Sequence, residues 1–150
     1  MCLSFDDATF DFFHHVYPLL LEKELPCVLA VPSGKISSKA NSSPEERLQL
    51  LLNPSRDLPL NNESYCSWEE IQEMSQSPFI KIASHSHSHV RCDDTIKEFE
   101  EEIIHSKKII ESNIQKKIDS FVYPYGKFSP QMHKKIRNMR FDLLRFLISD

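Results

Sequence analysis

Apolar and polar positions form blocks along the chain, and these blocks predict strands and helices in turn. Short apolar runs typical of buried strands occur at residues 2–5, 26–31, 79–83, 118–123 and 141–148. Between them, apolar residues recur every three or four positions over residues 8–24 and 95–115, which predicts helices there. Typical helix starts at Ser67 and at Ser129-Pro130 predict two more, to about residues 76 and 139. This alternation predicts an α/β fold in which helices wrap a parallel sheet, either as a barrel or as a doubly wound sheet.

Capping residues and a proline set the expected helix ends. Ser67 is followed three residues later by Glu70, and Thr95 by Glu98, which is the spacing of a capping box. Pro18 lies inside the first helical pattern, so we expect a kink or a break just before it, because proline lacks the backbone N–H that a helix interior uses.

Residues 35–66 differ in composition, being rich in Ser, Asn and Pro. Within them, Ser43 and Pro44 form a typical helix start, and that helix can run only to about residue 53 because Pro54 follows. A chain of 150 residues is a usual size for one domain with a core. We therefore expect a single domain over residues 1–150 with an insertion at about 35–66.

Charge and composition exclude several classes of function. A net charge of −4 and a sequence pI near 6.0 argue against nucleic acid or an anionic membrane as the partner. No apolar stretch approaches the ~20 residues that cross a bilayer, and no signal peptide is visible. We expect a cytoplasmic protein, or a cell-envelope protein if the chain is a fragment. The four cysteines contain no C-x-x-C pair, and we interpret them as reduced, mostly buried thiols.

Polar stretches follow three of the predicted strands, which is where α/β folds with parallel sheets place their chemistry. They are Asp6-Asp7, residues 84–89 with the sequence SHSHSH, and Tyr125-Gly126. In an extended chain His85 and His89 would lie about 13 Å apart, whereas on one helical turn they approach within about 6 Å. A shared metal therefore requires a turn directly after the strand. With Asp7 as the natural third ligand, two imidazoles and a carboxylate would form a zinc-type catalytic site, while the neighbouring carboxylate acts as general base.

The same residues also allow simpler interpretations. Histidines alternating with serines can be a polar loop, and paired aspartates can be an Asx turn or a helix cap. Cys92 lies three residues past His89 and is either a further ligand or an ordinary core thiol. A metallo-β-lactamase-like H-x-H-x-D-H motif does not fit, because Ser88 or His89 stands where Asp is needed and Val90 where the last His belongs.

Taken in order, the motifs resemble those of the polysaccharide deacetylase family, the NodB-homology domains of carbohydrate esterase family 4. Residues 3–8 (LSFDDA) are similar to T-F-D-D-G, residues 84–89 to H-x-x-x-H, and residues 121–126 (FVYPYG) to F-x-Y-P-Y-G. Residues 67–71 and 102–111 also look like stretches of the branch that acts on biofilm polysaccharides. The resemblance implies a distorted, incomplete (β/α) barrel and a metal-dependent hydrolase that removes N-acetyl groups from an amino-sugar polysaccharide or glycan.

The resemblance also implies a role for each matching residue. Asp7, His85 and His89 would hold a divalent metal, with zinc the expected ion, and His87 would point elsewhere. Asp6 would be the base that activates water. The backbone N–H of Tyr125 would stabilise the oxyanion together with the metal. The partner implied is a carbohydrate.

Three departures from the family pattern limit this resemblance. Ala8 replaces the usual Gly, and Val122 stands where many members have an Arg that orients the base. The late Leu-x-x-His motif, whose His is the general acid, has no match in residues 127–150, and His133 lies within a predicted helix. We therefore expect a domain truncated at its C-terminus, with an open barrel edge through which chains could self-associate. Without the acid, activity would fall by ~10²–10⁴-fold, and the alternative is an impaired or inactive homologue that binds metal or glycan without turnover.

Overall fold

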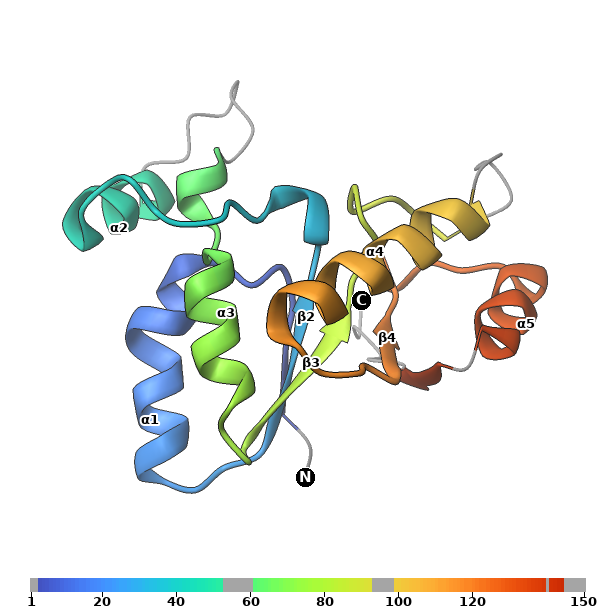
Figure 1. Cartoon of the computed structure of the whole chain (residues 1–150), viewed down its shortest axis with the longest axis horizontal. Helices are drawn as coiled ribbons and strands as arrows, with labels where there is room; N and C mark the ends of the chain where they lie inside the picture. The colour runs from blue at the N-terminus through green and yellow to red at the C-terminus, as the bar shows by residue number, and fades with distance from the viewer. Residues whose placement is uncertain (1–2, 53–60, 93–98, 140, 145–150) are drawn as a thin grey trace.

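The computed structural model describes residues 3–52, 61–92, 99–139 and 141–144, and its strands form one parallel sheet (Figure 1). The strands are β1 (Leu3–Phe5), β2 (Cys27–Val31), β3 (Ile80–Ser84), β4 (Ser120–Val122) and β5 (Asp142–Leu144). They lie side by side in chain order, each parallel to the next. A doubly wound sheet reverses its strand order at a switch point, so this order corresponds to the barrel alternative, and the sheet is a half-barrel.

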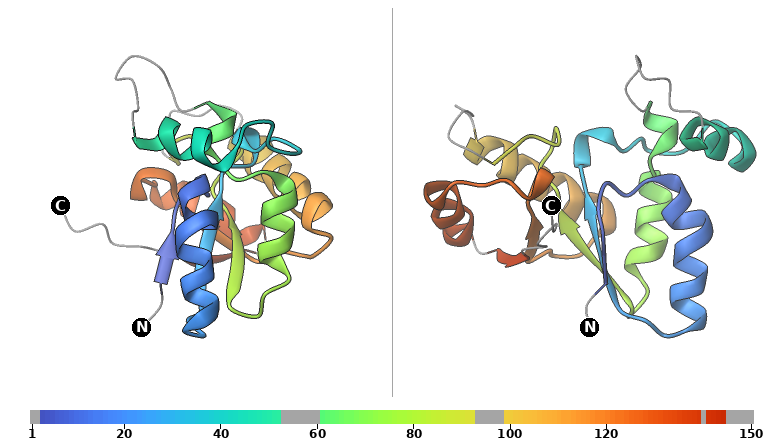
Figure 2. Two further views of the ribbon diagram at one scale, coloured as in Figure 1. Left: turned by 90° about the vertical axis from the view of Figure 1, so that its left-hand side faces the viewer. Right: turned by 180° about the vertical axis from the view of Figure 1, so that it is seen from behind.

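One layer of helices covers one face of the half-barrel. The helical segments of the chain are η1 (Phe12–Val16), α1 (Tyr17–Glu22), α2 (Pro44–Leu52), α3 (Trp68–Ser75), α4 (Phe99–Ile114) and α5 (Pro130–Asn138). Short 3₁₀ turns form η2 (Ser33–Lys35), η3 (Asn62–Ser64) and η4 (Pro124–Gly126). Right-handed crossovers between parallel strands place successive helices on the same side of a sheet, and Figure 2 shows this two-layer arrangement from two sides. Among the described residues, no helix is long and apolar enough to cross a membrane.

Alternation along the strands divides the buried side chains between the two faces. The face under the helices contributes to one large core with residues of α1, α3, α4 and α5, and its strand members include Cys27, Leu29, Val31, Ile80, Ile82 and Phe121. The inner face carries a small cluster of Val28, Ala30, Ala83 and Val122. Every residue of β2 is buried. A strand covered on both faces is apolar throughout, which explains why residues 27–31 form an uninterrupted hydrophobic run.

The first helix differs from the prediction at its start and near Pro18. Asp7 and Ala8 adopt left-handed backbone conformations, with φ of 71° and 50°, so the helix cannot begin at Ala8. Its first turns form the π-helical segment η1, in which the N–H of Tyr17 donates to the carbonyl of Phe12. The expected irregularity before Pro18 is therefore a widened turn rather than a break.

Most other predicted elements are present, with shorter bounds. The capping box of α3 is confirmed, because Ser67 Oγ accepts from the N–H of Glu70 and the Glu70 carboxylate accepts from the N–H of Ser67 at 2.7 Å. The strand expected over 118–123 is confined to Ser120–Val122. The capping box at Thr95 and Glu98 lies outside the described residues, as do positions 145–148 of the last predicted strand.

A buried arginine fixes the insertion to the rest of the domain. Arg47 of α2 is only 3% exposed. Its guanidinium donates to both carboxylate oxygens of Glu70, at 2.6 and 3.0 Å, and to the backbone oxygens of Glu63 and Tyr65, at 3.0 and 2.8 Å. It also lies 3.6 Å from the ring centre of Phe10. The carboxylate that caps α3 thus also holds the insertion in place.

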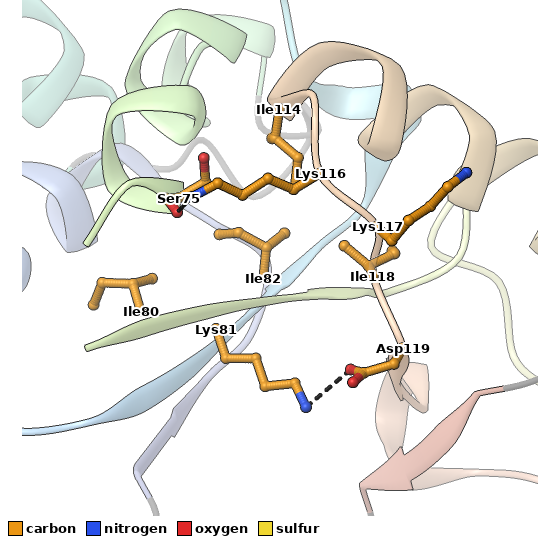
Figure 3. A pocket seen from close by; sticks show the side chains of 9 residues that line it. All are labelled: Ser75, Ile80, Lys81, Ile82, Ile114, Lys116, Lys117, Ile118 and Asp119. Carbon is orange, nitrogen blue, oxygen red and sulfur yellow. Dashed lines mark hydrogen bonds and ion pairs between the residues drawn. The ribbon is translucent and has the colours of Figure 1, made fainter. Parts of the chain in front are cut away.

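A pocket opens where β3 and β4 diverge (Figure 3). The two strands pair only at Ser84 and Phe121, so their amino-terminal ends separate. An ion pair of 2.9 Å between Lys81 and Asp119 crosses the gap. The other two lysines of the lining are also engaged, Lys116 with the carbonyl of Ser75 and Lys117 with Glu111. This pocket lies towards the amino ends of β3 and β4, whereas the predicted site residues follow the carboxyl ends of β1, β3 and β4.

Candidate metal centre

The structure brings together the three residues assigned to the metal. Asp7 follows β1, and His85 and His89 follow β3. Asp7 Oδ1 lies 3.0 Å from Nε2 of His89 and 3.8 Å from Nε2 of His85. The three potential ligand atoms lie within 4.8 Å of one another, and no other such group occurs among the described residues. Cys92 is fully buried and does not belong to the group.

A tight, left-handed turn allows the two histidines to approach. The strand ends at Ser84, and both Ser86 and His89 have positive φ angles, 62° and 57°. The imidazole ring centres lie 4.8 Å apart as a result. The N–H of Val90 donates to Ser86 Oγ at 3.1 Å and closes the turn. A metal shared by the two histidines was expected to need a helical turn directly after the strand. The chain instead turns through the left-handed residues Ser86 and His89.

The hydrogen bond to Nδ1 determines which nitrogen of His85 can bind a metal, and that of His89 is compatible with the same choice. His85 Nδ1 lies 2.9 Å from the carbonyl oxygen of Val122, which can only accept, so Nδ1 carries the proton and Nε2 has a lone pair. Burial lowers the pKa of His85, which favours the neutral, ligating form. His89 Nδ1 lies 3.2 Å from the hydroxyl of Tyr125. A hydroxyl both donates and accepts, so Tyr125 can pair with either tautomer of His89, including the Nδ1–H form that ligation through Nε2 requires.

The two neighbouring carboxylates differ in their electrostatic surroundings. A hydrogen bond from His89 lowers the pKa of Asp7, which keeps that carboxylate ionised. Removal of water from its carboxylate raises the pKa of Asp6, although the positive charge that His85 can carry opposes this. Asp7 thus has the properties of an ionised ligand, and Asp6 those of a stronger base than an ordinary aspartate.

The donor set fits a divalent metal such as zinc. Nitrogen and oxygen ligands lie about 2.0–2.2 Å from tetrahedral zinc, which places two ligand atoms roughly 3.3 Å apart. The separations of 3.0 and 3.8 Å from Asp7 Oδ1 lie on either side of this value. Two imidazoles and one carboxylate are a ligand set of catalytic zinc and of non-haem iron sites.

Two tyrosines lie beside the potential metal ligands, and only one of them was predicted. Tyr125 has a φ of 58°, a side chain that is 57% exposed, and a ring centre 4.7 Å from that of His89. Tyr65 enters from the insertion, because it forms a bridge with Thr9 just after the aspartates. Burial raises the pKa of Tyr65, and the charges of Asp7 and Tyr125 raise it further. No local sequence pattern connects Thr9 with Tyr65, which is why sequence reasoning missed it.

The remaining candidate histidines contact other partners. His133 Nδ1 pairs with the hydroxyl of Tyr123 at 2.9 Å. His87 Nδ1 lies 2.9 Å from Ser33 Oγ, and His87 is not part of the group of potential ligands.

Solved structures of deacetylases share this fold. A de-N-acetylase from Aggregatibacter actinomycetemcomitans has a TM-score of 0.76 and 22% identity, over 99% of this chain and 63% of that one. The deacetylase domain of BpsB from Bordetella bronchiseptica has a TM-score of 0.69 and 20% identity, over 90% and 60%. A CE4 family pseudoenzyme from Bacillus anthracis has a TM-score of 0.65 and 12% identity, over 95% and 42%.

This chain thus spans less than two thirds of the length of these solved relatives. No curated protein sequence matches it significantly. The sequence model of the polysaccharide deacetylase family matches residues 1–144, which include all three motifs. The chain therefore belongs to the polysaccharide deacetylase family.

Proposed function

We propose that the protein is a metal-dependent hydrolase that removes N-acetyl groups from an amino-sugar polysaccharide or glycan. The observation that supports this most is the grouping of Asp7 Oδ1 with Nε2 of His85 and of His89, next to Asp6. The family provides the substrate class, an acetylated carbohydrate. The geometry adds a site suited to hydrolysis.

In this proposal each residue has a separate task. Asp7, His85 and His89 hold the metal, which when bound polarises the acetyl carbonyl and makes a bound water more acidic. Asp6 takes the proton of the attacking water, a role that its raised pKa suits. The bond from His85 Nδ1 to the Val122 carbonyl keeps Nε2 free of a proton. The backbone N–H of Tyr125 donates to the oxygen on which negative charge develops.

A second candidate is a relative that binds metal or glycan without turnover. Val122 stands at the position of the arginine that orients the base in many members, and its side chain lies buried in the apolar inner cluster. The same fold occurs in the pseudoenzyme from Bacillus anthracis. Under this alternative the metal ligands are retained and the base is not activated.

Zinc content and acetate release distinguish the two candidates. The purified chain should bind one zinc ion and release acetate from N-acetylglucosamine oligomers. Asp6→Asn should retain zinc and lose activity by about 10²–10⁴-fold, whereas Asp7→Asn should weaken zinc binding. Zinc binding with no acetate release, and with Asp6→Asn indistinguishable from the parent chain, would favour the second candidate. Absence of bound zinc would contradict the first candidate and the metal-binding form of the second.

A further inference from the structure

The loop from His85 to His89 has a strained backbone. Ser86 and His89 both adopt the left-handed conformation, which is unfavourable for every residue except glycine. Such conformations persist only where surrounding contacts determine them. Contacts from η2 and from α4 reach the three residues between the two histidines, and both segments lie outside the three sequence motifs of the site.

Ser106 of α4 lies at the centre of these contacts. It is fully buried, and its hydroxyl donates to the carbonyl oxygen of Ser86 at 3.0 Å. Ser33 Oγ donates to Ser106 Oγ at 3.2 Å, and Ser84 Oγ lies 2.9 Å from it. A hydroxyl has one proton and two acceptor lone pairs. Since the proton of Ser106 is directed at Ser86, Ser84 must be a donor, and all hydrogen-bonding capacity of Ser106 is used.

This proton order also fixes the orientation of His87. The proton of Ser33 is directed at Ser106, so the Ser33 oxygen can only accept from His87, and Nδ1 of His87 carries a hydrogen. The backbone of the loop is held at the same point, because the N–H of Gly34 donates to the carbonyl of His87 at 2.8 Å. A Cβ atom at position 34 would lie 2.8 Å from that carbonyl oxygen, so only glycine permits this approach.

The far side of the loop is tied to α4 as well. The backbone N–H of Ser88 donates to the Glu102 carboxylate. The rings of His87 and His105 meet edge to face, with centres 4.6 Å apart. Every residue between the two metal-directed histidines is therefore bonded to η2 or to α4.

We propose that Ser106, Ser33 and His87 are positioning residues, which hold the histidine loop in its left-handed shape and set the approach of His85 to His89 before a metal binds. The inference rests on the metal site of the proposed function. It assigns His87 a definite task without making it a ligand, and it makes α4 part of the support of the site. Preorganised ligands bind metal more tightly because the loop need not be ordered on binding.

Zinc affinity, measured by competition with a chromophoric chelator, tests the buried hydroxyl. Ser106→Ala should weaken zinc binding by about 10–100-fold, the range found for groups that orient metal ligands. Ser75→Ala is the matched control, since Ser75 is also buried and its hydroxyl donates to Gln72 within α3, away from the loop. The control should change zinc affinity by less than about twofold, even if it lowers stability.

Two substitutions of His87 separate the effect of its hydrogen bond from the effect of its size. The side-chain NH₂ of asparagine can occupy the place of Nδ1–H but offers nothing in the place of Nε2. His87→Asn should therefore retain zinc affinity within about threefold, while His87→Leu weakens it about tenfold. If His87 were a ligand through Nε2, the asparagine variant would bind zinc no better than the leucine variant, and the proposal would be wrong.

Hydrogen exchange provides a measurement that does not depend on metal. Without added zinc, the peptide containing residues 85–90 should exchange faster in Ser106→Ala than in Ser75→Ala. Equal exchange and equal zinc affinity in these two folded variants would refute the inference. Failure of the parent chain to bind zinc would refute the proposed function, while the exchange comparison would still decide this inference. If Ser106→Ala does not fold, the two variants of the half-buried His87 decide it.

Discussion

Replacement of Arg47 by methionine should destabilise the domain more than most single substitutions. The pair of Arg47 with Glu70 is buried, with 4% and 15% of the two side chains exposed. Methionine retains the apolar stem beside Phe10 but removes the charge and every donor. The variant leaves the Glu70 carboxylate without its cation, and the carbonyls of Glu63 and Tyr65 without their donor.

The structure indicates the size of this loss. Removing one partner of a buried ion pair costs about 3–5 kcal/mol. Glu70 keeps the bond from the N–H of Ser67 and retains some contact with water, so the lower end applies. We expect Arg47→Met to lower the free energy of unfolding by about 3 kcal/mol, a large part of the ~5–15 kcal/mol of an ordinary domain. Adding Glu70→Gln removes the unpaired charge while retaining a cap, and should restore about 1–2 kcal/mol.

Urea unfolding followed by circular dichroism measures these differences. Because the arginine holds the insertion, protease cleavage within residues 35–66 should also become faster in Arg47→Met. A loss below about 1 kcal/mol would show that water replaces the arginine at little cost. A double variant no more stable than Arg47→Met would show that the unpaired carboxylate is not the source of the loss.

Three further predictions concern the site, the acid stability and the thiols. Tyr125→Phe retains the backbone N–H but removes the hydroxyl that pairs with His89 Nδ1. It should weaken zinc binding about tenfold in a chelator competition. Unchanged affinity would mean that water replaces the hydroxyl at His89 without loss. Lys81→Ala should cost less than about 1 kcal/mol at neutral pH, because both side chains of its ion pair are at least half exposed. The hydrogen bond from Lys81 lowers the pKa of Asp119 in the folded protein. The stabilisation from the pair is therefore present above pH 3.8, the pKa of an unfolded aspartate, and is lost as the pH falls through the lower pKa of the folded state. Stability curves of the parent chain and of Lys81→Ala that stay parallel over this pH range would contradict the prediction. In a Cys2→Ser variant no thiol should react with an aromatic disulfide before the protein unfolds, because the remaining thiols, Cys27, Cys66 and Cys92, are all buried. Burial also raises the pKa of the Cys66 thiol. A rapid reaction in the native state would refute this prediction.

Elements that depend on neighbouring residues could be predicted from the sequence. The capping box from Ser67 to Glu70 is a local pattern, and the helix that it begins lies where expected. The run of apolar residues 26–31 correctly indicated a strand, which the structure has as β2. The meeting of Asp7 with His85 follows from the rule that the carboxyl ends of parallel strands share one edge. The chemical roles of these two residues stay predictions.

Features that depend on distant contacts could not be predicted. The insertion is polar in composition, yet Arg47 within it is buried against Glu70. Glu70 belongs to another helix, so no local sequence pattern indicated this pair. The bridge that brings Tyr65 to Thr9 joins residues with no shared periodicity. The left-handed angle at Ala8 is indicated only by the resembling motif, which has Gly at that position, whereas the residue itself does not favour it.

The arrangement of the strands in chain order has a consequence for synthesis on the ribosome. Each new strand finds the preceding one already made, so the sheet can grow from one edge as the chain emerges. The predicted metal donors do not emerge together: Asp7 comes with β1, and His85 and His89 come only after β3. The Val122 carbonyl that orients His85 follows later still. A nascent chain therefore carries Asp7 through the addition of two further strands before His85 and His89 can meet it, and His85 gains its orienting carbonyl only when β4 has docked.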